Sequence, residues 1–211
     1  MRLLLFSLFF LTSSAFAAVL VTQTVGQVAD YVVTSREVQI STVIEGILFP
    51  SAKREGKGLV EVQLGQEAFN KDLTATLLEV VVGLEAENFN VGAINEAELN
   101  AAVVTVEKAV AGKAYWNALE VSNKELRRLV KRKIESKNFL KFRTNSMSGI
   151  ISDQEAHAYY EKNRVKFGSL PFASFKDNIK TFLSQQQLEE RLRSWFEVIK
   201  RKYKVRNFLS E

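Results

Sequence analysis

His157 is the residue best suited to chemistry in this sequence, because it is the only histidine among the 211 residues. It follows Glu155 and precedes Tyr160 on a predicted helix, where one imidazole could transfer a proton or bind a metal ion. A metal site needs three or four converging ligands, and the chain has neither a second histidine nor any cysteine. The pattern therefore favours a histidine at the surface, or one whose hydrogen bonds are made by neighbouring residues.

Carboxylate pairs are the other candidates for acid–base chemistry. Glu85 and Glu87 lie on one predicted helix, and Glu189 and Glu190 lie on another. Neighbouring helical positions point apart, so neither pair converges on one bond as the carboxylates of a glycosidase do. We interpret both pairs as solvated faces. The glycines beside Lys57 lack the spacing of a phosphate-binding loop, so the sequence predicts no enzyme, no metal ion and no cofactor.

The first 17 residues have the pattern of a signal peptide. Arg2 supplies a positive start, and residues 3–11 are apolar except for one serine, a run too short to span a bilayer. Small side chains then precede a predicted cleavage between Ala17 and Ala18. We therefore predict a signal peptide at residues 1–17 and an exported mature domain at residues 18–211. An uncleaved N-terminal anchor is the alternative.

Charge is unevenly distributed along the chain. Residues 18–120 hold 7 Lys or Arg against 14 Asp or Glu, whereas residues 121–211 hold 21 against 10. The two halves can attract each other, or the basic half can face an acidic partner or an anionic membrane surface. A solvated basic helix face is the plainer interpretation. Nucleic acid is the usual partner of such a patch, but export argues against it.

Hydrophobic periodicity and capping boxes divide the chain into helices. Each of four boxes places Ser, Thr or Asn three residues before Glu, and the scarcity of proline, with two in the chain, favours long helices. The predicted helices cover residues 34–49, 66–85, 95–112, 122–147, 152–162 and 174–199, and the boxes lie at residues 34–37, 95–98, 122–125 and 152–155.

A short strand is predicted in the tail, where Tyr203 and Val205 alternate with Lys204 and Arg206. It can pair with an extended segment at residues 25–33. The predicted fold class is therefore mainly α, a single multi-helix domain with a short two-stranded element that joins the N- and C-terminal ends.

The most basic predicted helix, at residues 122–147, combines an apolar stripe with five cations on the rest of its surface. Those cations are Arg127, Arg128, Lys131, Arg132 and Lys133.

Near the end of that helix Phe139 and Phe142 flank Lys141, and one buried stripe cannot easily hold both rings. Exposed aromatic side chains ringed by Lys and Arg make an adhesive surface for unfolded chains. Packing of both rings in the core is the alternative.

Two segments of the C-terminal half carry a resemblance to a known family. Residues 151–167, with the sequence ISDQEAHAYYEKNRVKF, resemble the helix that leads into the parvulin domain of SurA-type periplasmic chaperones and their prolyl-isomerase relatives. Residues 171–179 and the amphipathic helix after them are similar to the segment that follows that domain. Residues 28–38 resemble the first strand and helix of the family more loosely. The resemblance thus covers both ends of the chain outside residues 1–17.

The chain departs from the family between residues 167 and 171. Only Gly168, Ser169 and Leu170 stand where the isomerases insert a parvulin domain of about a hundred residues, a common size for a small domain. Isomerase activity is therefore not implied. The resemblance implies a SurA N-terminal-like domain, a helical cradle in the periplasm that holds unfolded or outer-membrane client polypeptides without ATP.

From the aromatic pattern and the resemblance we predict client contacts at five side chains. An exported structural or assembly factor that docks on one dedicated partner is the alternative function, and an enzyme with an unrecognised carboxylate site ranks last. The predicted client-binding residues are Phe139, Phe142, Tyr159, Phe167 and Phe172.

Overall fold

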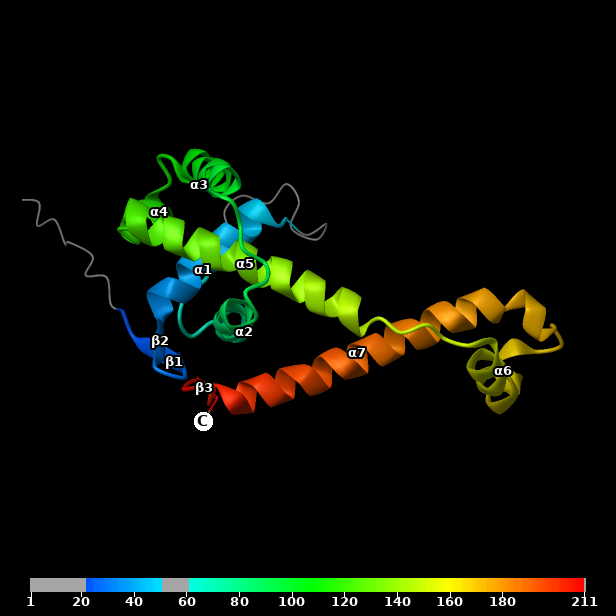
Figure 1. Ribbon diagram of the computed structural model, residues 1–211. Helices are drawn as coiled ribbons and strands as arrows, with labels where there is room; N and C mark the ends of the chain where they lie inside the picture. Colours follow the sequence, from blue (N-terminus) through cyan, green and yellow to red (C-terminus); the bar gives the residue numbers. More distant parts are fainter. Residues whose placement is uncertain (1–21, 51–60, 211) are drawn as a thin grey trace, which may run out of the picture.

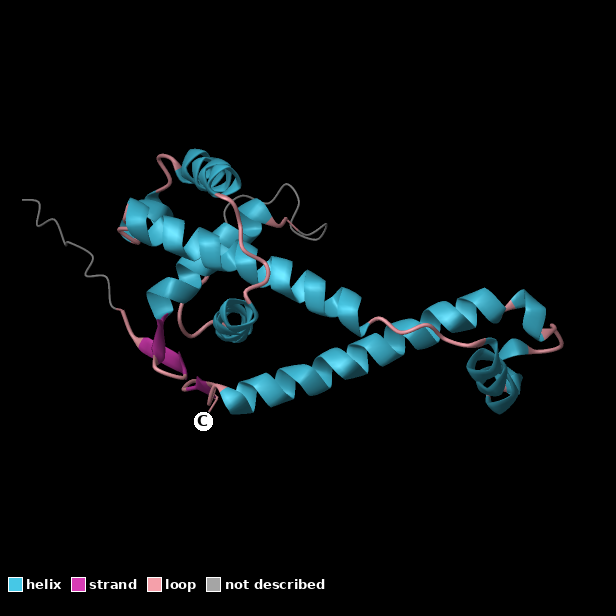
Figure 2. Ribbon diagram, viewed as in Figure 1, coloured by secondary structure: helices cyan, strands magenta, loops and turns pink. Residues whose placement is uncertain are grey.

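The structure is a computed structural model that describes residues 22–50 and 61–210. The predicted signal peptide, its cleavage site between Ala17 and Ala18 and the glycines beside Lys57 lie outside the described residues. Within the described ranges, no helix is both long and apolar enough to cross a membrane. The mainly α fold class is confirmed, as helices dominate the molecule in Figure 2.

A three-stranded antiparallel sheet joins the two ends of the described chain. Its strands are β1 (Thr24–Val28), β2 (Tyr31–Thr34) and β3 (Arg206–Asn207), in the order β2-β1-β3. The predicted pairing of the ends is confirmed, with Gly26 opposite Asn207. The tail strand begins later than predicted, because the chain turns at Lys204, which has a φ of 48°. The sheet has one strand more than predicted, because the N-terminal segment turns back at Ala29, which has a φ of 49°.

Gly26 lets the tail strand approach β1 closely. A Cβ atom at this position would lie 2.9 Å from the carbonyl oxygen of Arg206 and 2.9 Å from the side chain of Leu77. A larger residue would therefore push β3 and the helix beneath it away from β1.

Five helices follow β2 and, with the sheet and the end of the last helix, make up what we call the body, residues 22–50, 61–147 and 195–210. Polar side chains of Thr34, Asn95 and Ser122 cap three of these helices at the predicted positions. The one helix that the sequence did not predict is five residues long and lacks a side-chain cap. The helices are α1 (Ser35–Leu48), α2 (Glu67–Phe89), α3 (Glu96–Val110), α4 (Ala114–Ala118) and α5 (Asn123–Met147).

The body contains two apolar cores. One joins the sheet, α2, the middle of α5 and the end of the last helix, and includes Val25, Phe69, Phe139 and Ile199. The other joins α1, α3, α4 and the start of α5, and includes Ile44, Val106, Trp116 and Leu129.

The remaining elements extend away from the body, as Figure 1 shows. They are α6 (Asp153–Lys162), two short 3₁₀ helices, η1 (Arg164–Phe167) and η2 (Phe172–Ser174), and α7 (Lys176–Lys202). We call residues 150–183 the tip. Its own apolar cluster includes Ile151, Tyr160 and Ile179. With 27 residues, α7 is about 40 Å long and returns the chain from the tip to the sheet.

Candidate functional site

His157 and Glu155 do not form a reactive pair. The imidazole of His157 is exposed, its Nε2 atom lies 3.9 Å from Glu161, and its ring packs edge-on against Phe172 at 5.0 Å. Glu155 instead completes the capping box, accepting a hydrogen bond of 2.8 Å from the backbone N–H of Ser152. That hydrogen bond lowers the pKa of Glu155. Across residues 22–50 and 61–210, no three His, Asp or Glu side chains lie close enough together to hold a metal ion.

One of the four carboxylates interpreted as solvated is buried. Glu85 is 4% exposed and accepts a hydrogen bond of 2.5 Å from Lys202. It therefore ties α2 to the last turn of α7, and the interpretation was wrong for this residue. Glu87, Glu189 and Glu190 are exposed as predicted.

The basic surface predicted for α5 was wrong at two positions, Arg132 and Lys133, which point into the body. Arg132 lies 2.7 Å from Glu37 on α1 and 2.8 Å from Glu79 on α2. Lys133 pairs with Glu79 as well and donates a hydrogen bond of 2.8 Å to Ser41 on α1. This ion network therefore joins three helices, and Glu37 binds Arg132 instead of reaching back to its own cap.

Glu79 is the centre of the network. Burial would raise the pKa of this carboxyl, but the charges of Lys133 and Arg132 outweigh burial and hold the pKa below its ordinary value. Burial opposes the charge on Arg132, while Glu79 and Glu37 raise the pKa of the guanidinium. Glu79 and Arg132 thus carry opposite charges at neutral pH, and each stabilises the charge of the other. Their arrangement matches the predicted attraction between the acidic and basic halves of the chain.

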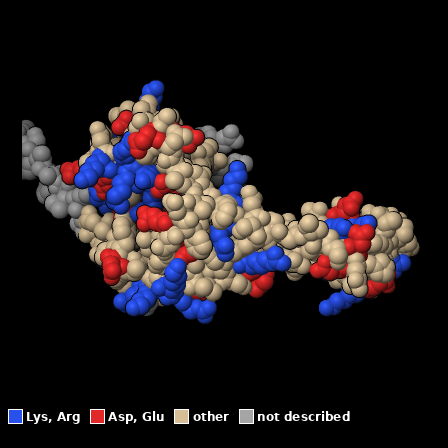
Figure 3. All heavy atoms as spheres, viewed as in Figure 1, with Lys and Arg blue, Asp and Glu red and all other residues tan. Residues whose placement is uncertain are grey.

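Other cations of α5 stay at the surface. Arg127 pairs with Glu96 on α3, Arg128 donates a hydrogen bond of 2.8 Å to the hydroxyl of Tyr31, and Lys131 is exposed. Figure 3 shows Lys and Arg side chains gathered over the first turns of α5. Contact of this surface with an anionic membrane or an acidic partner stays a prediction.

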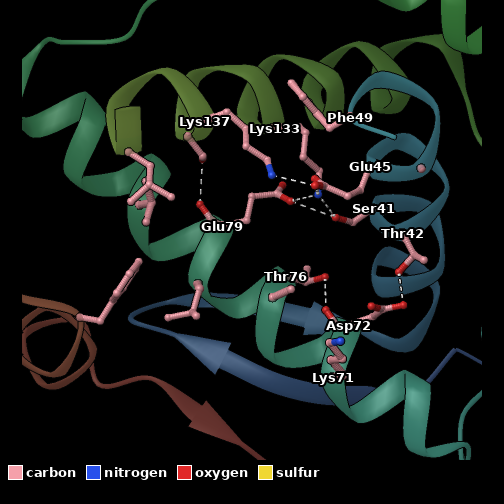
Figure 4. Close-up of a pocket in the computed structure, with 17 residues that line it drawn as sticks. Ser41, Thr42, Glu45, Phe49, Lys71, Asp72, Thr76, Glu79, Lys133 and Lys137 are labelled. Carbon is pink, nitrogen blue, oxygen red and sulfur yellow. Dashed lines mark hydrogen bonds and ion pairs between the residues drawn. The ribbon is translucent and has the colours of Figure 1, made fainter. Parts of the chain in front are cut away.

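A pocket of about 480 Å³ lies beside the ion network. Figure 4 shows α1, α2 and α5 around it, with Ser41, Glu79 and Lys133 at its inner wall. The last long helix, α7, contributes one side chain, Phe196. The other apolar side chains that line the pocket are Phe49, Ala75, Leu78, Val82 and Leu140.

The charged groups of the pocket balance. Three lysines face three carboxylates along its wall, and most are already paired. Lys137 lies 2.7 Å from Glu45, and Thr42 donates a hydrogen bond of 3.1 Å to Asp72. The charged lining residues are Lys71, Lys133, Lys137, Glu45, Asp72 and Glu79.

The predicted client contact at Phe139 was wrong, because this ring is fully buried. It packs between Phe89 at 5.8 Å, Phe142 at 6.1 Å and Trp195 at 6.2 Å, measured between ring centres. Phe142 is 46% exposed, so this part of α5 buries one of the two rings that flank Lys141 and exposes the other.

The three other predicted client contacts are partly buried in the tip. Tyr159, Phe167 and Phe172 pack with the buried ring of Tyr160, which lies 5.0 Å from Phe167 and 5.6 Å from Phe172. These rings therefore stabilise the tip, and each offers only part of its surface to another molecule.

Sequence reasoning missed the most exposed apolar side chains of the tip. Ile150 is 98% exposed, Val165 is 97% exposed and Leu170 is 53% exposed. Phe182, which the sequence assigned to the buried stripe of α7, is 50% exposed. The pocket was missed as well. Its one local signal was Glu79, a carboxylate inside an otherwise apolar run of α2.

The pocket and the tip offer apolar contact surfaces on two different parts of the molecule. In the described ranges, the residues proposed for acid–base chemistry do not converge on a common point. The resemblance to SurA-type chaperones stays a prediction from the quoted segments. Comparisons of the chain with models of protein families, with curated proteins and with solved structures found no match.

Proposed function

We propose that this protein is an ATP-independent, chaperone-like protein of the periplasm that binds unfolded or outer-membrane polypeptides. The pocket between α1, α2 and α5 receives apolar side chains of the client. One observation carries this proposal: the pocket combines apolar walls with charged groups that already compensate one another.

The size of the pocket suits a short stretch of polypeptide. Its volume of about 480 Å³ falls within the range of roughly 300–1,000 Å³ that is common for binding pockets. An extended segment could place one or two side chains inside while its backbone stays at the surface.

The charges of the pocket favour a neutral occupant. Lys133 is held by Glu79 and Ser41, and Lys137 is held by Glu45. A charged ligand at this inner wall would have to break one of these pairs and leave a charge without its partner. An aliphatic or aromatic side chain of the client can instead pack against the apolar lining residues, such as Leu78 and Val82, without disturbing the ion pairs.

Exposed rings near the buried Phe139 extend the apolar surface of the body. The ring centres of Phe89 and Phe142 lie 5.8 Å and 6.1 Å from that of Phe139. Each apolar side chain that a client buries fully contributes about 1.5–3 kcal/mol. Several such contacts together hold a client, while each one alone releases it quickly, so no nucleotide is required for exchange.

An aggregation assay tests the proposal. An unfolded outer-membrane β-barrel protein is diluted from denaturant, and its light scattering is followed with and without the purified chain beginning at Ala18. We expect suppression at low molar excess. The variant Ala75→Trp fills the pocket from an exposed position on α2 and should need about tenfold more protein, which corresponds to the loss of one client side chain.

Ala101→Trp provides the matched control, because Ala101 is also an exposed helical alanine but lies on α3, away from the pocket. It should behave as the unmodified protein. Unchanged scattering at a large excess of protein would refute the proposal. One stoichiometric complex that survives gel filtration, in place of many transient ones, would favour the assembly factor instead.

A further inference from the structure

The helix α7 carries an apolar side chain at each of the two surfaces. Phe196 lines the pocket in the body. Phe182 belongs to the tip, where it is 50% exposed and packs beside Tyr159 with 5.5 Å between ring centres. The two residues are 14 positions apart on one uninterrupted helix, which corresponds to about 21 Å along its axis.

The helical repeat places both rings on the same flank of α7. Fourteen residues make about 3.9 turns, so the two side chains differ by only about 40° around the axis. Ile179, in the tip cluster, and Ile199, in the body core, mark the faces of α7 that pack against the tip and the body. The flank with Phe182 and Phe196 lies between these two faces.

The side chains between the two rings are polar. Gln186, Glu189 and Arg193 occupy the same flank and are exposed. The carboxylate and the guanidinium balance each other, as the charges of the pocket do. This flank therefore offers two apolar anchor points separated by a neutral polar stretch.

We propose that the flank of α7 selects extended polypeptides that carry two apolar segments separated by about six or seven residues. An extended chain covers about 3.3–3.6 Å per residue, so this spacing matches the distance between Phe182 and Phe196. One segment enters the pocket and the other packs against Phe182. This inference rests on the proposed function and adds a spacing rule to it. The balanced charges along the path favour a neutral client.

Synthetic neutral peptides test the spacing rule. Three fluorescently labelled peptides carry one Phe-Leu pair, two pairs separated by two Ser/Gly residues, or two pairs separated by seven. Binding to the purified protein is measured by anisotropy. The seven-residue spacer should bind about tenfold or more tightly than the single pair, because the second contact becomes intramolecular. The two-residue spacer covers only about 7 Å and should bind with an affinity similar to that of the single pair.

A pair of matched variants locates the second anchor. Phe182→Ser should abolish the advantage of the long spacer and leave the affinity for the single-pair peptide unchanged. Val198→Ser alters another exposed apolar residue of α7, on the opposite side of the helix, and should keep the full advantage. Circular dichroism confirms that both variants fold.

The outcomes separate the two proposals. If no peptide binds, the proposed function fails. If the single-pair peptide binds and the long spacer brings no advantage, only the spacing rule is overturned. A loss of self-association in Phe182→Ser, measured by analytical ultracentrifugation, with unchanged peptide binding would assign the tip to contacts between copies of this chain and would also overturn the rule.

Discussion

In the body, two apolar cores and a buried ion network stabilise five helices, whereas the tip depends on one small cluster of aromatic and aliphatic side chains. Figure 3 shows the narrow neck between these two regions. The tip helix α6 makes its main contacts with α7 and η1. The two regions thus share a helix but little packing, and each can lose stability without the other.

The ion pairs differ in the same way. Glu79 in the body is buried, and the side chains of its cations Arg132 and Lys133 are only 13% and 8% exposed. Asp153 in the tip pairs with Lys176 and Lys180 at the surface. Removing one partner of a buried ion pair costs much stability, because the other charge stays buried alone. An exposed ion pair contributes little, because solvent screens it. The body can therefore hold a pocket of fixed shape beside its charges, and the tip can adjust to what it contacts.

Removal of the central carboxylate should have the largest effect on stability. Glu79→Ala leaves Arg132 and Lys133 buried with one charge partner fewer, which costs about 3–5 kcal/mol. Urea denaturation followed by circular dichroism measures the loss. Asp153→Ala, which removes the exposed pairs of the tip, should leave the unfolding midpoint unchanged; equal losses in the two variants would contradict the contrast between the regions.

Acid should weaken the body in the same manner but to a smaller extent. The pKa of Glu79 is lowered in the folded protein, so its stabilising effect is present at neutral pH and is lost as the pH falls through that folded pKa. A protonated carboxyl keeps hydrogen bonds, so the loss is smaller than in Glu79→Ala. Thermal melts between pH 7 and pH 3 should show a shallower pH dependence in Glu79→Gln than in the unmodified protein.

Truncation of a buried ring in the tip should act locally. Tyr160 is 2% exposed and donates a hydrogen bond of 2.5 Å to the carbonyl oxygen of Leu170. Tyr160→Ala should cost the tip about 3 kcal/mol and leave the body folded. Hydrogen exchange should accelerate in residues 153–183 alone, and faster exchange in α1 or α2 would mean that the two regions unfold together.

Loss of a helix cap should have the smallest effect. Ser152 and Glu155 form a full capping box at the start of α6, and Ser152→Ala should cost the tip about 1 kcal/mol. The same change at Ser122, which caps α5, provides the comparison in the body. Hydrogen exchange should rise only in the first turns of the helix that loses its cap.

Local sequence signals determined where four of the described helices begin. Thr34, Asn95, Ser122 and Ser152 cap helices as predicted, because a cap depends on residues three positions apart. The fold class and the pairing of the two ends also followed from the sequence. The short helix α4 and the second strand of the hairpin did not, since neither has a strong local pattern.

Only the tertiary structure decided which stripes are covered. Phe139 and Phe142 lie three residues apart on α5. Neighbouring elements bury Phe139 fully, whereas Phe142 stays 46% exposed. Ser41, Glu79 and Lys133 meet at the pocket although 38 and 54 residues separate successive members in the chain. Helical periodicity fixes how side chains are placed around their own axis, but the packing of other helices determines which of them reach solvent, a partner charge or a cavity.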